Sequence, residues 1–389
     1  MTTSVTLDAA GTTGELRERV REAIAHRRGL RITGSGSWLD ANRPVAAATT
    51  LSTSGLTGLV DYVPGDLTLT ARAGTTLDDI ARATAAEGQW LAMDPLGDPA
   101  VSTIGATIAT ASYGSLAHHF GTPRDATLGL ELVTGKGEII RGGGRVVKNV
   151  AGFDLTRLIT GSWGSLGAIT EVTVRLRALP ALQRTLAIDI GPDIAAIDRL
   201  RVALRGLPFV PLAAQLLHPA LASAVRVGRT YATLLVRIGG NAEAVQVQLG
   251  QLRAIGEARD APDRVWDLLR SSEPRGAVAF RLSRLPTRFS ESWRDAMQLL
   301  DGVPDAYCHG DPGRGVVRCV IPSGAGADSS TLRRCVTSPF SGTRIVETLP
   351  AELWPLVAPS AASDRLARGI KRAFDPDRVM NPGILGEAE

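Results

Sequence analysis

Small residues gather directly after the first strand-like pattern, where a backbone could hold an anion. Residues 30–33 are apolar enough for a short strand, and four small residues follow: Gly34, Ser35, Gly36 and Ser37. Glycine permits positive φ, so successive N–H groups can turn toward one phosphate. A simple strand-to-loop turn explains the pattern equally well. Leu39 stands where a dinucleotide-binding Rossmann fingerprint needs its third glycine, which disfavours a Rossmann NAD site.

A second stretch lacks charge altogether. Residues 99–123 contain no Asp, Glu, Lys or Arg and are rich in Ser, Thr, Gly and Ala. One interpretation is a tightly packed core loop. The other is a backbone that wraps a large buried ligand, because small side chains let main-chain N–H groups approach it and hydroxyls supply neutral hydrogen bonds. A membrane span would be richer in Leu, Ile and Val and would not begin beside Pro99.

A few cationic side chains could act on an organic acid. Arg281 and Arg284 lie on or beside an expected strand over about 277–282 and could hold a substrate carboxylate. The commoner alternative is a pair of surface or salt-bridged arginines. His118 and His119 end the charge-free stretch and are expected to form an exposed loop pair.

Composition bounds the function classes. The chain has 389 residues, 44% of them apolar and 21% charged, which predicts two or three folded domains and excludes wholesale disorder. The net charge of +4 comes without a Lys/Arg block, so no nucleic-acid partner is expected. No apolar run is long enough for a transmembrane helix, and the N-terminus lacks a secretory signal pattern.

The cysteines also limit the chemistry. Cys308, Cys319 and Cys335 are too few for an iron–sulfur cluster, which needs about four thiolates. They are also too scattered for a disulfide framework, and we expect them to be small buried apolar residues in a cytoplasmic protein.

Patterned elements must position these residues. Thr12 and Glu15 form a capping-box pattern at the start of a helix, and Gly135 to Gly137 predict a hairpin between strands 128–134 and 138–141. Apolar and polar residues alternate over 169–176, as in a half-buried strand, and Pro180 marks a domain boundary. Beyond it, alternating strand and helix patterns predict an antiparallel sheet flanked by helices. Residues 322–360 are expected to be a loop or linker.

Four segments taken in order are more specific than any one of them. They are residues 32–37, 68–75, 102–106 and 161–170, and together they closely resemble the FAD-binding domain of the vanillyl-alcohol oxidase (PCMH-type) flavoproteins. The ending Phe374-Asp375-Pro376 with Asn381-Pro382-Gly383 is similar to the D-2-hydroxyacid branch of that superfamily. Residues 147–158 (VKNVAGFDLTRL) and Trp163 resemble the FAD-binding E subunit of bacterial glycolate oxidase.

The resemblance implies an α+β fold. Residues 1–180 would form a PCMH-type FAD-binding domain, residues 181–345 an α/β cap domain with an antiparallel sheet flanked by helices, and residues 346–389 a segment returning to the FAD domain. Gly34 to Ser37 would bind the pyrophosphate of FAD through backbone amides. Further contacts to FAD would come from residues along the later motifs: Pro95, Ser102, Thr103, Gly105, Ala106, Ala109, Gly114, Gly164, Gly167 and Ile169.

The resemblance also implies how FAD is held and where the motifs thin out. Some relatives bond FAD covalently through a His after the glycine loop, but Ser37 and Trp38 stand here, so FAD is expected to be non-covalent. Many D-2-hydroxyacid members carry a His-x-Gly-Asp-Gly-Asn-x-His metal motif in the cap. In the matching residues 311–318, Arg314, Val316 and Arg318 stand where the motif has its Asp, its Asn and its second His. Neither arginine nor valine is a metal ligand, so no metal is expected.

The resulting hypothesis is an FAD-binding subunit of a heteromeric glycolate (2-hydroxyacid) oxidase or dehydrogenase. Its implied partners are a catalytic FAD subunit and an iron–sulfur subunit, its substrate is a small 2-hydroxyacid, and any membrane association would run through the partners. One alternative is a self-sufficient FAD-dependent D-2-hydroxyacid dehydrogenase in which Arg281 or Arg284 binds the carboxylate. The other is a non-catalytic, flavin-carrying assembly subunit.

Overall fold

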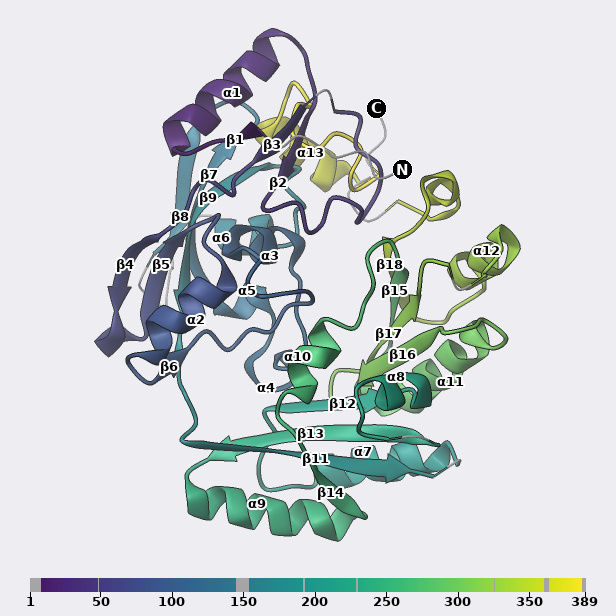
Figure 1. Ribbon diagram of the computed structural model, residues 1–389. Coiled ribbons are helices and arrows are strands. Elements are labelled where there is room, and N and C mark those ends of the chain that lie inside the picture. Colours follow the sequence, from purple (N-terminus) through teal and green to yellow (C-terminus); the bar gives the residue numbers. More distant parts are fainter. Residues whose placement is uncertain are drawn as a thin grey trace. The chain divides into compact units, whose positions relative to one another are not determined.

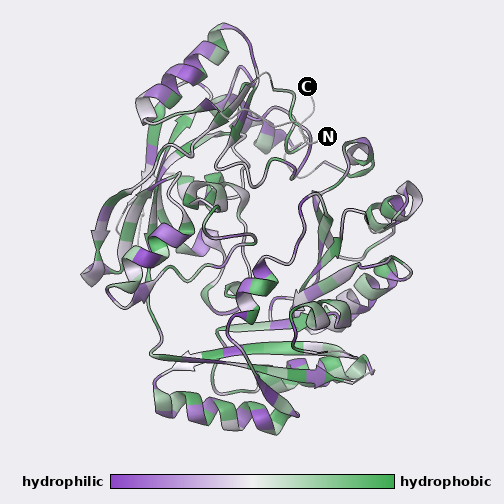
Figure 2. Ribbon diagram, viewed as in Figure 1, coloured by the Kyte–Doolittle hydropathy of each residue, from purple (hydrophilic) through white to green (hydrophobic). Residues whose placement is uncertain are grey.

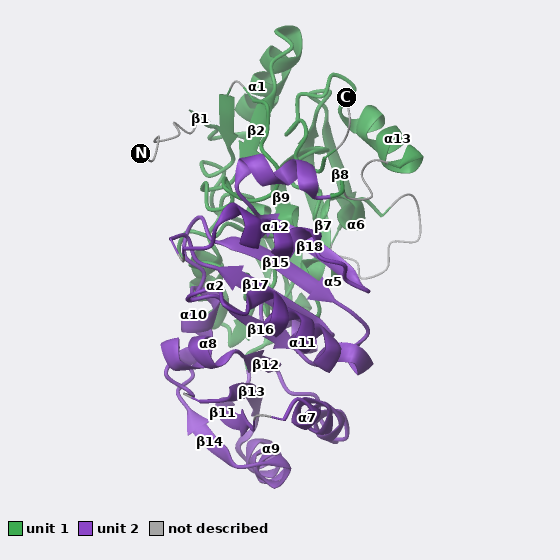
Figure 3. Cartoon of the chain, turned by 90° about the vertical axis from the view of Figure 1, so that its right-hand side faces the viewer, with its two compact units in different colours: residues 1–113, 121–179, 358–389 green, residues 114–120, 180–357 purple. Residues whose placement is uncertain are grey.

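The computed structural model describes residues 8–47, 49–144, 154–191, 193–228, 230–324, 326–359 and 364–386. Residues 147–153, which carry most of the resemblance to the glycolate oxidase E subunit, lie outside this range. The chain divides into two compact units (Figure 3). Unit 1 comprises Met1–Tyr113, Gly121–Leu179 and Ala358–Glu389, and unit 2 comprises Gly114–Phe120 and Pro180–Val357. Unit 2 therefore runs past the expected limit at residue 345 and includes a short segment from the expected FAD domain.

Unit 1 begins with a parallel three-stranded sheet and one helix. The strand order is β1 (Asp8–Ala9), β3 (Thr49–Ser52), β2 (Leu30–Thr33), and helix α1 spans Thr13–Ala25. The expected cap is confirmed, because the Thr12 hydroxyl accepts a hydrogen bond from the Glu15 N–H at 3.1 Å. Leu16 and Val20, four residues apart, are fully buried.

The second sheet of unit 1 has five antiparallel strands (Figure 1). Its order is β4 (Leu59–Val63), β5 (Thr68–Arg72), β9 (Gly167–Arg175), β7 (Thr127–Thr134) and β8 (Ile139–Gly143). The predicted alternation in β9 is confirmed, since Val172 and Val174 are fully buried while Thr173 between them is not. The predicted hairpin is the β7–β8 pair.

Short helices and a small ribbon complete unit 1. The helices are α2 (Leu77–Ala85), α3 (Ile104–Thr110), α5 (Pro123–Ala126), α6 (Leu155–Ile159) and α13 (Arg365–Phe374), and β6 (Gln89–Trp90) pairs with β10 (Arg177–Ala178). Ile104 and Ile108 of α3 are fully buried in one cluster with Leu69 of β5. Helix α3 therefore lies against the five-stranded sheet and occupies part of the charge-free stretch.

Unit 2 is built on one eight-stranded antiparallel sheet. The strand order is β14 (Ala258–Ala261), β11 (Leu182–Ile190), β13 (Ala232–Gly240), β12 (Ala213–Leu217), β16 (Tyr307–Asp311), β17 (Val316–Ile321), β15 (Val278–Ser283) and β18 (Thr343–Thr348). This confirms the expected antiparallel sheet flanked by helices.

Both faces of this sheet are covered because successive side chains of a strand point to opposite faces. In β11, Leu186 and Ile188 join the larger core cluster, whereas Ala187 joins a second cluster. The helices that contribute to the larger cluster are α7 (Ala195–Arg205), α9 (Ala242–Ile255), α11 (Phe289–Leu300) and α12 (Ser329–Thr337). Helices α8 (Pro219–Ala224) and α10 (Val265–Arg270) supply the second cluster.

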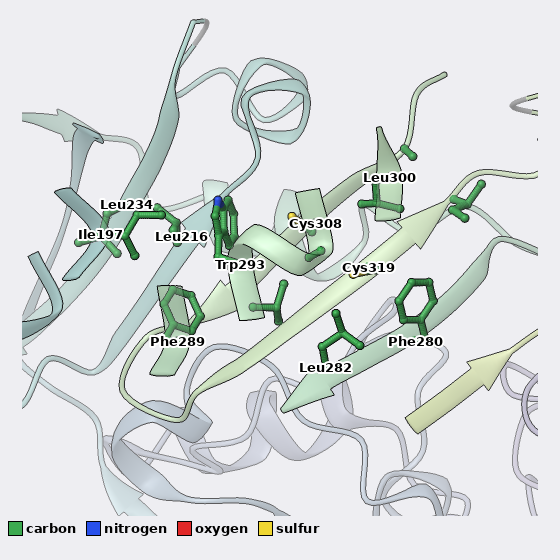
Figure 4. Packing of buried hydrophobic residues seen from close by; sticks show 14 of the residues in the cluster. Ile197, Leu216, Leu234, Phe280, Leu282, Phe289, Trp293, Leu300, Cys308 and Cys319 are labelled. Carbon is green, nitrogen blue, oxygen red and sulfur yellow. The ribbon is translucent and has the colours of Figure 1, made fainter. Parts of the chain in front are cut away.

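The hydropathy and the packing follow this arrangement. Figure 2 shows hydrophobic and hydrophilic residues mixed along α9 and α1, as in helices with one buried side. Figure 4 shows the larger cluster, in which Phe289 and Trp293 of α11 face the sheet that carries Leu216 and Phe280. The ring centroids of Phe289 and Trp293 are 6.1 Å apart.

The prediction of a loop or linker over residues 322–360 is wrong. This stretch contains α12, β18 and the 3-10 helix η3 (Ala351–Leu356). Composition hid them because the elements are short and half-exposed: only Leu332, Cys335 and Val336 of α12 are buried. Strand β18 exists because β15 supplies its hydrogen-bonding partner, which is a contact between residues distant in sequence.

Candidate functional site

A narrow pocket in unit 1 lies where β2, α3 and the start of β9 meet. Many of the residues implied by the resemblance border it: Gly34, Ser37, Gly105, Ala106, Ala109, Gly164, Gly167 and Ile169. Others do not border it: Ser35, Gly36, Pro95, Ser102, Thr103 and Gly114. Thr103 is instead the N-cap of α3, and Gly114 belongs to unit 2. The structure thus brings the glycine loop, the charge-free stretch and the 161–170 motif to one place.

Two glycines let the segments around the pocket approach closely. A Cβ on Gly34 would lie 2.6 Å from the Thr103 hydroxyl, and one on Gly105 would lie 2.6 Å from the Cβ of Ala73. Gly36 has a φ of +91°, in the region that favours glycine. The glycines therefore serve first to pack the loop against α3 and α3 against the end of β5.

Arg31 of β2 is a pocket residue that the sequence analysis missed. Its Nη2 donates to the carbonyl oxygens of Trp38 and Ala41 at 3.4 Å each, and to that of Leu39 at 3.2 Å. Its Nη1 is buried, and no described residue accepts a hydrogen bond from it. Burial lowers the pKa of the Arg31 guanidinium. The sequence did contain a signal for this residue, because Arg31 is a cation in an otherwise apolar strand pattern directly before the glycine loop.

A buried donor without a partner fits an anionic group. Arg31 is the charged residue among the described residues that border the pocket. The Ser35 hydroxyl is likewise buried with no partner in the described part of the chain. Leaving such groups unsatisfied costs about 1–3 kcal/mol each, so a bound phosphate that accepts from them would be stabilised.

Asn381, from the C-terminal signature, connects two of the segments that border the pocket. Its Oδ1 accepts from the Ile32 N–H at 2.6 Å, and its Nδ2 donates to the Trp163 carbonyl oxygen at 2.6 Å. A Cβ on Gly164 would lie 2.8 Å from this Nδ2. Asn381 thus joins β2 to the 161–170 motif, and it borders the pocket itself.

The signature is held in place by a buried ion pair. Asp375 is fully buried and accepts from Lys371 Nζ at 2.8 Å and from the N–H groups of Val379 and Met380 at 2.9 Å each. These bonds fix the turn that leads to Asn381. The Phe-Asp-Pro part of the signature therefore supports the Asn-Pro-Gly part.

These features fit FAD. The pocket has a volume of about 50 Å³ and is bordered by the buried Arg31 guanidinium, which suits an anionic group such as a pyrophosphate. Arg31 offers a buried donor to that group from the border of the pocket, and the Ser35 hydroxyl is a second buried donor in the adjacent glycine loop.

The arginines suggested for carboxylate binding are engaged within unit 2. Arg281 Nε lies 2.5 Å from Glu347 Oε1, and Arg284 Nη2 lies 2.6 Å from Asp295 Oδ2. The Arg284 guanidinium also stacks 4.2 Å from the ring centre of Phe340. Both therefore match the salt-bridged alternative.

The stretch that resembles a metal motif holds a buried ion cluster instead. Arg318 of β17 is paired with Glu273 and Glu347. Burial alone would lower the pKa of Arg318, but the two carboxylates outweigh it and raise that pKa. The positive charge of Arg318 thus compensates the negative charges of Glu273 and Glu347.

The expectation of an exposed histidine pair is wrong for His118. This residue lies on the short helix α4 (Ala117–Phe120), and only 10% of its side chain is exposed. Its Nδ1 lies 2.8 Å from Asp311 Oδ1, and Asp311 also accepts from the Gly313 N–H at 2.8 Å. His119 is exposed, as expected. The pairing joins residues far apart in sequence, so no local pattern could reveal it.

Comparison with known proteins agrees with this geometry. Residues 7–143 match the family described as FAD binding domain (FAD_binding_4). Residues 7–143 thus carry an FAD-binding domain of the PCMH type, which supports FAD as the cofactor.

Individual relatives add detail. The chain is 37% identical over 193 residues to glycolate oxidase subunit GlcE of Escherichia coli, covering 50% of this chain and 55% of that protein. It is 35% identical over 202 residues to glycolate oxidase subunit GlcD of Bacillus subtilis, covering 50% of this chain and 43% of that protein. The chain therefore spans about half the length of these two relatives.

A solved structure shows the same fold. An alkyldihydroxyacetonephosphate synthase superimposes with a TM-score of 0.69 at 17% identity, covering 97% of this chain and 76% of the other. This likeness confirms the PCMH-type fold. None of the helices in the described residues has the length and apolar character needed to cross a bilayer.

Proposed function

We propose that this chain is the FAD-binding subunit of a heteromeric oxidase or dehydrogenase acting on glycolate or a similar small 2-hydroxyacid. The observation that carries the proposal is a contrast between the units. Unit 1 offers buried, unpartnered donors at Arg31 and Ser35 beside a glycine loop. In unit 2, Arg281 and Arg284 are neutralised by carboxylates of the chain.

The cysteines support a role within a complex. Cys308, Cys319 and Cys335 are buried, and burial raises the pKa of the Cys335 thiol. Three buried thiols cannot hold a four-thiolate cluster. Electrons leaving the flavin must then pass to another molecule, and the resemblance to GlcE supports a catalytic FAD subunit and an iron–sulfur subunit as partners. A cytoplasmic location is part of the same proposal.

The residues of the chain divide the work of binding. Arg31 and the amides of the glycine loop would hold the FAD pyrophosphate, and Ser37 with Trp38 leaves the flavin non-covalent. Asn381 would keep the loop and the 161–170 motif in register. Bound FAD supplies the capacity to accept two electrons and to pass them on singly.

One experiment separates this proposal from its alternatives. The purified chain is loaded with FAD, and glycolate or D-lactate is added without oxygen while flavin absorbance is recorded. The proposal expects the flavin to stay oxidised until the partner subunits are added, and to bleach then. Bleaching by the chain alone favours a self-sufficient D-2-hydroxyacid dehydrogenase. A flavin that stays oxidised even in the active complex indicates an assembly subunit.

A further inference from the structure

Helix α13 lies at the edge of unit 1 (Figure 3) and is held in place through one of its sides. Ile370 and Phe374, four residues apart, pack against the core cluster to which β5 and β9 contribute. Lys371 Nζ donates to the carbonyl oxygen of Ser165 at 2.7 Å. Ser165 belongs to the 161–170 motif, so the helix is attached to a segment that borders the candidate pocket.

The opposite side of α13 is formed by arginines. Arg365, Arg368 and Arg372 are three and four residues apart, so they share one side of the helix, and all three are exposed. They make no ion pair with any residue that the structure describes. The helix contains no Asp or Glu, and the neighbouring Asp364 caps it by accepting from the Ala367 N–H. Three uncompensated positive charges thus extend over about 10 Å of helix.

The stability of the helix does not explain this pattern. Like charges at spacings of three and four residues destabilise a helix, whereas opposite charges at these spacings support it. Helix α1 shows the supporting arrangement, in which Arg17, Arg19 and Arg21 each lie within 3.4 Å of a carboxylate. Leu366, next to Arg365 in the chain, is 73% exposed. Unpaired arginines beside an exposed leucine indicate a surface for a partner, because arginine is enriched in protein interfaces.

We propose that the arginine side of α13 is the docking surface for an acidic partner subunit. That the partner is a subunit of the same complex rests on the proposed function, whereas its acidic character follows from the helix alone. Guanidinium groups at a fixed spacing donate paired hydrogen bonds to carboxylates, so a row of Asp or Glu side chains is the complementary surface. Because Lys371 attaches this helix to Ser165, the partner docks beside a segment that borders the candidate pocket.

An anionic membrane is a poorer match for this helix. A helix that lies on a membrane buries its apolar side at the boundary of headgroups and acyl chains. Ile370 and Phe374 already pack against the core, so Leu366 is the large apolar side chain that α13 presents outside it. Three arginines with so small an anchor attract anionic lipid weakly, and salt screens that attraction.

The test uses the full chain loaded with FAD and a fluorescein-labelled acidic peptide that repeats the unit Glu-Glu-Ala-Ala three times. Fluorescence anisotropy at low salt gives the dissociation constant, and the wild type should bind the peptide saturably. The triple variant Arg365→Gln, Arg368→Gln, Arg372→Gln should bind it about tenfold more weakly, because several exposed charge pairs are lost together.

The matched control is the triple variant Arg17→Gln, Arg19→Gln, Arg21→Gln on α1. It removes the same number of positive charges from unit 1, but from ion pairs, so the peptide affinity should change less than about twofold. The proposal is overturned if the two triple variants bind the peptide equally or if the wild type shows no saturable binding. It is also overturned if the wild type binds vesicles of phosphatidylglycerol and phosphatidylcholine but not the peptide, since the surface would then belong to a membrane.

The same variants separate this proposal from the proposed function. When the partner subunits are titrated into the flavin-bleaching experiment, the α13 variant should need about tenfold more partner for half-maximal bleaching, and the α1 variant should match the wild type. Bleaching by the α13 variant at wild-type partner concentrations would overturn the docking role. The peptide measurement needs neither substrate nor partner subunits. If no protein bleaches but the α13 variant alone loses the peptide, the proposed function fails and the acidic docking surface stands.

Discussion

The side-chain amide of Asn381 donates a hydrogen bond to the carbonyl oxygen of Trp163 at 2.6 Å, across 218 positions of sequence. The same side chain accepts from the Ile32 N–H, so one residue near the C-terminus joins two segments of the N-terminal half. The edge-to-face contact of Trp163 with Trp38, at 5.9 Å between ring centres, continues this connection into the glycine loop. The geometry of the candidate pocket in unit 1 therefore depends on a residue close to the C-terminus.

Replacing Asn381 should weaken FAD binding. Asn381→Ala removes three hydrogen bonds of a residue that is 1% exposed and leaves the Ile32 and Trp163 backbone groups without partners. Each unsatisfied group costs about 1–3 kcal/mol, so a loss of at least about tenfold in FAD affinity is expected by fluorescence titration. Asn241→Ala, which removes only a helix cap in unit 2, should leave that affinity unchanged. Equal effects of both variants would contradict the pocket role.

Replacing Arg31 should also weaken FAD binding, but for an electrostatic reason. Arg31→Gln removes the buried cation that we assign to the pyrophosphate, and the expected loss of affinity is about tenfold to a hundredfold. Adenosine carries no phosphate, so the wild type and Arg31→Gln should bind it with equal affinity. That affinity can be measured from the competition of adenosine with FAD. Arg19→Gln on the exposed face of α1 serves as the control and should bind FAD as the wild type does. An Arg31→Gln protein with unchanged FAD affinity would place the pyrophosphate elsewhere.

The close approach at Gly34 predicts a steric effect on stability. Gly34→Ala would put a Cβ 2.6 Å from the Thr103 hydroxyl and 3.1 Å from the Cβ of Ala106. Overpacking of this kind costs about 1–3 kcal/mol in the free energy of unfolding, which chemical denaturation measures. Gly65→Ala meets no atom within 4 Å and should change that free energy by less than about 0.5 kcal/mol. A neutral Gly34→Ala variant would mean that the loop moves away from α3.

The buried His309 makes stability depend on pH. Burial lowers the pKa of His309 to about 4, and its Nδ1 lies 3.2 Å from Gln215 Oε1. Between about pH 4 and pH 6.5 the unfolded chain binds a proton that the folded chain does not. The free energy of unfolding should therefore fall as the pH falls through this window, by up to about 1.4 kcal/mol per pH unit.

The comparison of wild type with His309→Gln isolates this contribution. Glutamine keeps a group that can hydrogen-bond to Gln215 but does not titrate. Denaturation curves recorded between pH 4 and pH 7 should show a shallower pH dependence for the variant. Parallel curves for the two proteins would mean that His309 is accessible to protons in the folded state.

Local patterns in the sequence determined much of unit 1 and the general plan of unit 2. The capped helix at Thr12, the alternation along β9 and the β7–β8 hairpin depend on neighbours within a few residues, so they could be predicted. The FAD-binding class followed from the order of several short motifs. The same local patterns failed over residues 322–360, where β18 exists only because β15 lies beside it.

The tertiary structure decided which residues meet. Arg31 donates to the Leu39 carbonyl oxygen just beyond the glycine loop. Asn381 contacts Trp163, and His118 contacts Asp311, only after distant segments pack together. The tertiary structure also pairs Arg281 with Glu347, a partner that the sequence spacing could not identify. The physical reason is that backbone preferences and hydrophobic periodicity act over one or two turns or strands, whereas the pairing of buried polar groups depends on which segments come into contact when the core forms.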